Sequence, residues 1–162
     1  MTSPGGRAVP SLSPASALAL GTIVVGILDL ADALIFFGLR GVAPIRILQS
    51  IASGLLGRAA FSGGWQTAVL GVLLHFFIAF TIVLVFMLAS RRIQGLTRRP
   101  ILSGLLYGLA AYCVMNFIVV PLSAAASGAR SWPVLINGIA IHMLGVGLPA
   151  SLFARAASVR DR

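Results

Sequence analysis

The sequence predicts an all-α membrane protein: a bundle of four transmembrane helices with an amphipathic helix between spans 1 and 2. The composition excludes an ordinary soluble domain, because 59% of the 162 residues are apolar and only 9% are charged, whereas soluble domains carry about a quarter charged residues. The mean hydropathy is +1.04. In addition, four apolar stretches reach the roughly 20 residues that a helix needs to cross a bilayer. These predicted spans are residues 17–38, 66–90, 101–125 and 134–156.

The predicted spans belong to one membrane domain, residues 17–156, with a short tail at each end. Residues 1–16 are rich in Pro, Gly and Ser and cannot bury apolar surface, so we expect a disordered N-terminal tail. The first span is too long for a signal-peptide core and contains two aspartates, so we expect it to stay in the mature protein. Residues 157–162 form the predicted C-terminal tail.

A second helical pattern occupies residues 44–58, between spans 1 and 2. Pro44 suits the first turn of a helix, and the apolar residues then recur with helical spacing. The apolar face is Ile47, Leu48, Ile51 and Leu55, and the opposite face is Arg46, Gln49, Ser50, Ser53 and Gly57. Because this helix is too short to span, it either lies flat at the outer interface or re-enters and caps a cavity. The pattern favours the flat arrangement.

Arginine distribution predicts the orientation. All twelve basic residues are Arg, and the net charge is +9. Eight of them lie in the N-terminal tail, the second loop and the C-terminal end, and four lie in the first and third loops. Since positive charge is retained in cytoplasmic loops, both termini are predicted to be cytoplasmic. Trp65 and Trp132 precede spans 2 and 4 on the opposite side, as an interfacial aromatic belt places them.

The basic character also bears on partners. A pI near 11.9 suggests nucleic acid in a soluble chain, but here the arginines flank apolar runs, so no nucleic-acid partner is expected. The bilayer itself is the predicted partner. Its anionic head groups are expected near the RRIQGLTRR loop, although a cytoplasmic loop carries such residues in any case. The loop arginines are Arg91, Arg92, Arg98 and Arg99.

Two small motifs in the third span are weaker signals. Gly104 and Gly108 form a GxxxG pair, which serves either packing within the chain or a homo-oligomer. Cys113 is the single cysteine, so no disulfide within the chain is possible, and we expect it to be a small packing residue.

Polar side chains inside the spans are the candidate functional residues. An ionisable group in a bilayer costs several kcal/mol unless it faces the bundle interior and finds a partner. At about 1.5 Å per residue, five of them fall into one layer on the outer side of the span midpoints. This polar layer consists of Asp29, Asp32, His75, Asn116 and His142. Tyr112 and Asn137 are further polar residues within the spans.

Three interpretations of the polar layer stay open. Hydrogen-bonded Asp and His pairs that fix helix register correspond to a structural or interaction role, which the sequence favours. A proton or small-cation transporter or channel component is the alternative, because histidine changes charge near neutral pH. A metal-dependent enzyme is the third, with Asp29, Asp32, His75 and His142 as ligands. No nucleophile stands beside a base, so no catalytic residue or cofactor is predicted.

Four runs carry a resemblance to known proteins: RGVAPIRILQSIASGLLGRAAFSGG, LLHFFIAF, YCVMNFIVVPLSA and NGIAIHMLGVGLP. They resemble a group of small bacterial four-helix inner-membrane proteins with no assigned activity, and more faintly the YagU-like inner-membrane proteins. The resemblance covers residues 21–155. It implies an inner-membrane location and a four-span bundle, and it brings no functional residues with it.

Overall fold

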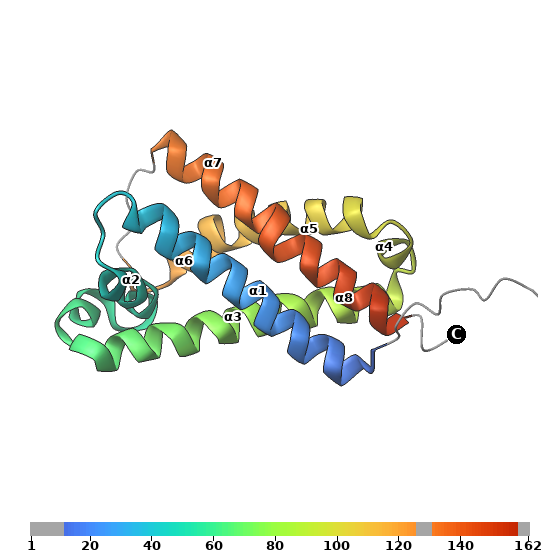
Figure 1. Cartoon of the computed structure of the whole chain (residues 1–162), viewed down its shortest axis with the longest axis horizontal. Coiled ribbons are helices and arrows are strands. Elements are labelled where there is room, and N and C mark those ends of the chain that lie inside the picture. Colours follow the sequence, from blue (N-terminus) through green and yellow to red (C-terminus); the bar gives the residue numbers. More distant parts are fainter. Residues whose placement is uncertain (1–11, 126–130, 159–162) are drawn as a thin grey trace, which may run out of the picture.

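The computed structural model describes residues 12–125 and 131–158, and the regular structure in these ranges is helical. Four helical stretches are long and apolar enough to cross a membrane. They are α1 (Pro14–Gly38), α3 (Gly64–Arg92), Pro100–Leu122 and Trp132–Ser158. All four run along the long axis of the molecule (Figure 1). The predicted all-α fold with four spans is confirmed.

The first helix begins earlier than the predicted span. The Ser13 hydroxyl oxygen accepts a hydrogen bond from the Ser16 N–H at 3.1 Å, which caps the helix, and Pro14 suits its first turn. Residues 14–16 are therefore helical, although the sequence places them in the disordered tail. The predicted tail up to residue 11, and residues 159–162 of the C-terminal tail, lie outside the described residues.

The third and fourth spans each contain a π-helical turn. The third is α5 (Pro100–Val114), η2 (Met115–Val119) and α6 (Val120–Leu122). The fourth is α7 (Trp132–Ile141), η3 (His142–Gly147) and α8 (Leu148–Ser158). Each π-helical turn ends two residues before a proline, Pro121 or Pro149, whose missing N–H frees a carbonyl in the preceding turn. The widened turns let both helices continue past the proline.

The third span ends three residues before its predicted boundary. Ser123 adopts an extended backbone (φ −86°, ψ 171°), which terminates α6 at Leu122. The Ala124 N–H then donates to the Gly54 carbonyl oxygen at 2.9 Å. The chain is thereby tied to the helix that lies across this end of the bundle.

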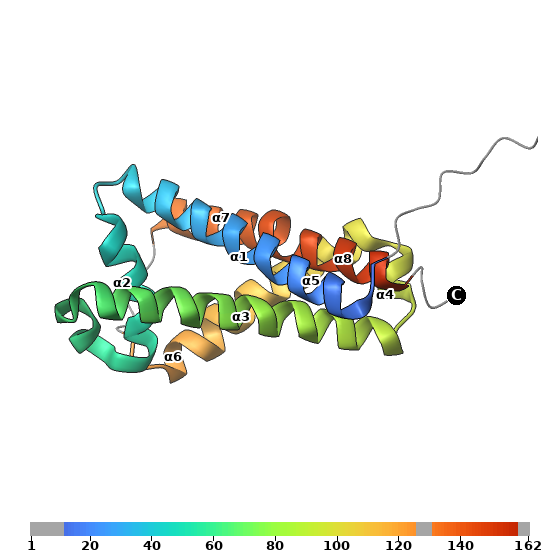
Figure 2. The ribbon, with the colours of Figure 1, turned by 60° about the horizontal axis from the view of Figure 1, so that its bottom comes forward.

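That crossing helix is α2 (Pro44–Leu56), followed by the 3₁₀ turn η1 (Gly57–Ser62). Figure 2 shows α2 crossing the bundle end between α1 and α3. It approaches α3 closely at Gly71, where a Cβ atom would overlap the Leu48 carbonyl oxygen. At the opposite end, the short helix α4 (Gly95–Arg98) connects α3 to α5.

The predicted faces of α2 are partly wrong. Gln49 and Ser53, assigned to the polar face, are only 2% and 5% exposed, whereas Leu55 of the apolar face is 62% exposed. The Gln49 side-chain amide donates to the Gly64 carbonyl oxygen at 3.0 Å. In a membrane protein lipid accepts exposed leucine, so polar side chains find their partners within the protein instead.

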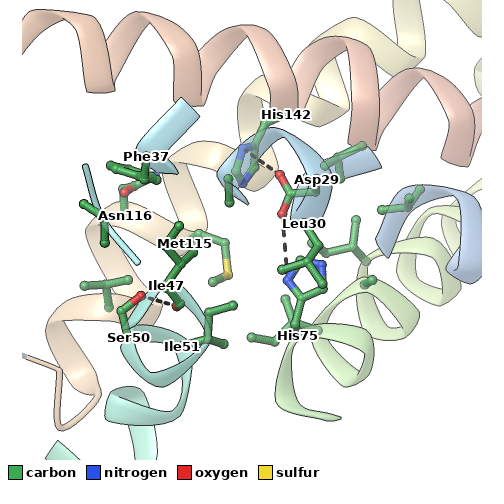
Figure 3. A pocket seen from close by; sticks show the side chains of 18 of the residues that line it. Asp29, Leu30, Phe37, Ile47, Ser50, Ile51, His75, Met115, Asn116 and His142 are labelled. Carbon is green, nitrogen blue, oxygen red and sulfur yellow. Dashed lines mark hydrogen bonds and ion pairs between the residues drawn. The ribbon is translucent and has the colours of Figure 1, made fainter. Parts of the chain in front are cut away.

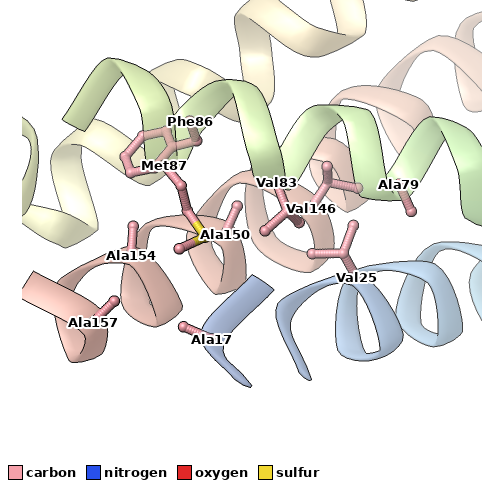
Figure 4. Close-up of a cluster of buried hydrophobic side chains, with 10 residues drawn as sticks. All are labelled: Ala17, Val25, Ala79, Val83, Phe86, Met87, Val146, Ala150, Ala154 and Ala157. Atoms are coloured by element: carbon pink, nitrogen blue, oxygen red, sulfur yellow. The ribbon is translucent and has the colours of Figure 1, made fainter. Parts of the chain in front are cut away.

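The hydrophobic core fills the half of the bundle nearest α4. Its members come from α1, α3, η3 and α8, and they are mostly small (Figure 4). Phe86 is the largest fully buried side chain and meets the Tyr107 ring edge-on, with 4.9 Å between centroids. The core residues are Ala17, Val25, Ala79, Val83, Phe86, Met87, Val146, Ala150, Ala154 and Ala157.

The GxxxG pair packs within the chain. A Cβ at Gly108 would overlap the His142 carbonyl oxygen, and one at Gly147 would overlap the Gly104 carbonyl oxygen. Both glycines of the motif thus allow α5 to touch the backbone of η3 and α8. This close contact positions His142 relative to the other spans.

Candidate functional site

A hollow of about 530 Å³ lies between α1, α2, α3, η2 and η3. Aliphatic side chains form most of its wall, and polar side chains enter it from all five elements (Figure 3). The polar wall residues are Asp29, Arg46, Ser50, His75, Asn116 and His142. A mostly apolar hollow with a few converging polar groups is the usual form of a small-molecule site. We call it the central cavity.

Asp29 lies between two histidines in the central cavity. Its Oδ2 is 4.0 Å from His75 Nδ1, and its Oδ1 is 4.0 Å from His142 Nδ1. The carboxylate is 27% exposed, and the two rings are 11% and 17% exposed. Figure 3 shows the two rings on either side of the carboxylate. Three spans therefore bring one acid and two bases together, and we call these residues the acid–base cluster.

The backbone fixes the His75 tautomer. His75 Nε2 lies 2.9 Å from the Gly26 carbonyl oxygen, and because a carbonyl only accepts, Nε2 carries a proton. In the neutral ring Nδ1 is then a bare lone pair, and it faces the Asp29 carboxylate. Two electron-rich atoms in this position repel each other unless a proton is held by one of them. The arrangement therefore leaves a place for one proton between Asp29 Oδ2 and His75 Nδ1.

Gly26 makes this bond possible. A Cβ at this position would overlap the Phe76 ring, so glycine leaves room for this ring between α1 and α3. The ring of Phe76 stands edge-on to His75, with 5.6 Å between centroids. A hydrogen-bonding role for the Gly26 carbonyl had no signal in the sequence.

His142 also presents its Nδ1 to Asp29, but as an N–H and not as a lone pair. Its Nδ1 lies 2.9 Å from the Gly138 carbonyl oxygen, one turn earlier, so this nitrogen also carries a proton. The same N–H side faces Asp29 Oδ1, and the Tyr112 ring meets the imidazole edge-on at 5.4 Å. His142 opens the π-helical turn η3, and such turns are frequent at functional sites.

Asp32 and Asn116 have other surroundings. The Asn137 side-chain amide donates to Asp32 Oδ2 at 2.6 Å. Asp32 and Asn137 both lie outside the lining of the central cavity. Asn116 lines it from η2, while its amide donates to the Tyr112 carbonyl oxygen at 2.8 Å. The predicted polar layer thus divides into the acid–base cluster and a separate Asp32–Asn137 pair.

A metal site was the third interpretation of the polar layer, with Asp29, Asp32, His75 and His142 as candidate ligands. Among the described residues, no three His, Cys, Asp or Glu side chains are placed to hold an ion. Asp32, one of the four expected ligands, is bonded to Asn137. Of the four candidate ligands, Asp29, His75 and His142 face one another, whereas Asp32 has a different partner.

Two wall residues, Arg46 and Ser50, come from α2 and were not predicted as site residues. The Arg46 guanidinium donates to the Phe61 carbonyl oxygen at 3.1 Å and lies 4.9 Å from the Phe61 ring centroid. The Ser50 hydroxyl donates to the Ile47 carbonyl oxygen at 2.6 Å. Helical periodicity shows which residues share a face of α2, but where α2 lies depends on long-range packing.

A scan of protein-family models, a search of curated proteins and a search of solved structures each found no match to this chain. The resemblance to small bacterial inner-membrane proteins therefore stays a prediction, and the geometry of the cavity carries the functional argument.

Proposed function

We propose that this protein moves protons across the bacterial inner membrane through the acid–base cluster. The observation that carries the proposal is that the Asp29 carboxylate lies 4.0 Å from both His75 and His142 on the wall of a 530 Å³ cavity. Intramembrane ionisable groups that line a cavity are typical of proton relays. A purely structural aspartate is bonded directly to its partner, as Asp32 is.

The chemistry of the cluster supports proton transfer. The Asp29–His75 pair accepts one proton between atoms that otherwise repel, and histidine changes charge between about pH 5 and 8. His142 Nδ1–H lies 4.0 Å from the other carboxylate oxygen, but it is already bonded to the Gly138 carbonyl oxygen. A proton that reaches Asp29 is therefore stabilised from the His75 side, where Nδ1 can accept it. The distances of 4.0 Å are closed by a small side-chain movement or by one water molecule.

The two halves of the bundle support a gated pathway. The central cavity extends from the acid–base cluster to α2, whereas the hydrophobic core fills the half toward α4. In this conformation the apolar core blocks a proton from the second half. Transport therefore requires α1 and α8 to move apart at residues such as Ala17 and Ala154, which are buried in the core.

The orientation is also part of the proposal. The exposed arginines of the α4 end face the cytoplasm and bind anionic lipid head groups. They are Arg91, Arg92, Arg98 and Arg99, and none makes an ion pair within the described ranges. Trp65 and Trp132, 71% and 77% exposed, then stand at the outer interface, as the predicted aromatic belt requires.

Proton flux into liposomes tests the proposed function. Purified protein is reconstituted with a pH-sensitive dye inside, and a pH gradient is imposed. We expect Asp29→Asn to reduce the flux about tenfold or more, since an amide cannot carry the proton. Asp32→Asn is the matched control, because it changes a carboxylate one turn away and leaves an oxygen to accept from Asn137. Absent wild-type flux, or full flux in folded Asp29→Asn, contradicts the proposal.

A further inference from the structure

A second hollow of about 320 Å³ lies between α3 and α5. It is lined from α3 by residues such as Phe77 and Val85, which are 65% and 49% exposed. From the α5 side it is lined by Ala110 and Val114, and Val114 is 47% exposed. Such exposed apolar surface on a membrane-spanning helix faces lipid. We call this hollow the lateral groove.

The lateral groove offers a ligand no free polar group from its side chains. Only Thr81 and Tyr107 carry hydroxyls there. The Thr81 hydroxyl donates to the Phe77 carbonyl oxygen at 2.9 Å, and the Tyr107 hydroxyl donates to the Ile82 carbonyl oxygen at 2.6 Å. Because both are already bonded, the groove suits an apolar chain.

The lateral groove adjoins the central cavity. Ile78, Ile82 and Met115 line both the groove and the central cavity, so the two hollows share a wall. Met is unbranched and adapts to irregular gaps, so Met115 is the most adaptable of the three. An elongated molecule that moves these three side chains aside occupies both hollows at once, with its chain toward the lipid and its head beside Asp29.

The charge of the cluster selects the head group. Without its exchangeable proton, the Asp29–His75 pair carries one negative charge in a mostly apolar cavity, and this charge is costly unless a cation neutralises it. The other titratable groups on the cavity wall are His142, whose Nδ1–H is bonded to Gly138, and Arg46, whose guanidinium is held on Phe61. A monovalent cation and the proton therefore compete for the same charge.

Resting on the proposed proton function, we propose that the protein binds an amphipathic organic cation that enters from the bilayer. Its alkyl chain lies in the lateral groove, and its ammonium head lies beside Asp29 in place of the proton. Release of the proton when the cation binds, and of the cation when the proton returns, makes the cluster an exchange site. The apolar wall provides affinity for the chain, and the single carboxylate provides selectivity for positive charge.

Binding of dodecyltrimethylammonium to the protein in lipid nanodiscs tests this inference. We expect saturable binding that weakens as the pH falls, is lost in Asp29→Asn and is retained in Asp32→Asn. Dodecanol, which has the same chain without the charge, is expected to bind at least about tenfold more weakly. Equal binding of dodecanol, or unchanged binding of the cation by Asp29→Asn, overturns the inference.

Blocking the lateral groove separates this inference from the proposed function. Ala110→Phe fills the groove from α5, and Val85→Phe fills it from α3. Both are expected to weaken cation binding about tenfold while proton flux stays at the wild-type level. Leu106→Phe, which adds an aromatic ring to α5 outside both hollows, is the control. Cation binding unaffected by both groove variants overturns the lateral route. If the wild-type protein shows no proton flux, the proposed function is overturned instead.

Discussion

Asp29 and Asp32 lie one helical turn apart on α1, and their surroundings divide their roles. Asp32 accepts a 2.6 Å hydrogen bond from Asn137, which is typical of a half-buried polar pair that holds two helices in register. Asp29 has no partner closer than 4.0 Å among its two histidines, and it faces the central cavity. The carboxylate with looser contacts is the one free to exchange a proton or a ligand.

Removal of one partner of the structural pair is expected to cost stability. Asn137→Ala leaves the Asp32 carboxylate without its donor, and we expect the free energy of unfolding to fall by about 1–3 kcal/mol. Replacement of both residues by leucine should recover much of this loss, since no unpaired group remains. Detergent-induced unfolding measures both variants. An Asn137→Ala variant as stable as the wild type contradicts the structural role of the pair.

At the scale of the element, hydropathy predicted the four spans because the bilayer requires a long apolar run in each. The rise per residue predicted that Asp29, His75 and His142 lie at a similar level, and the structure brings these three side chains together. Which side chains meet within the layer did not follow. The rotation of each helix is set by contacts such as that of Gly26 with Phe76, and the division between Asp29 and Asp32 depends on that rotation.

The crossing helix α2 shows a second limit of sequence reasoning. Its helical period was readable from the sequence, but its buried face was not, because the helix is surrounded by both protein and lipid. Gln49 is buried because Gly64 offers it a carbonyl oxygen, whereas Leu55 is exposed. Periodicity alone cannot assign a buried face when the surroundings also accept apolar side chains.

Close packing of α5 against η3 should depend on the GxxxG pair. Gly108→Leu places a side chain where the His142 carbonyl oxygen lies, so we expect a loss of about 1–3 kcal/mol in stability. Gly38→Leu is the matched control, since nothing lies within 4 Å of a Cβ built there. If the Gly108→Leu variant is instead as stable as the wild type and only its oligomeric state in detergent changes, the motif acts between chains.

At the scale of the whole molecule, the two ends of the bundle differ. One end carries α2, the tryptophans and the central cavity, and the other carries the hydrophobic core and the arginines beside α4. The central cavity and the apolar core therefore follow one another along the long axis of the bundle, and under the proposed function the core is the gate. The orientation of the chain in the membrane therefore determines from which side a proton first reaches the acid–base cluster under the proposed function.

Cysteine labelling measures that orientation. In a Cys113→Ala background, Gln94→Cys at the α4 end and Ser62→Cys at the α2 end are treated with a membrane-impermeant thiol reagent in spheroplasts. We expect Ser62→Cys to be labelled from outside and Gln94→Cys only after the membrane is broken, because loops rich in arginine stay in the cytoplasm. The reverse pattern contradicts the proposed orientation.

The pH difference at which net proton movement stops shows whether the protein transports protons. Liposomes containing the protein are held at a fixed membrane potential with potassium and valinomycin, and the internal pH is followed until it is constant. If protons are the transported ion, the final pH difference changes by about one unit for every 59 mV of applied potential. It is also independent of sodium, and Asp29→Asn liposomes reach it far more slowly. A final internal pH that does not change with the membrane potential, or that changes with the sodium gradient, contradicts proton transport by this protein.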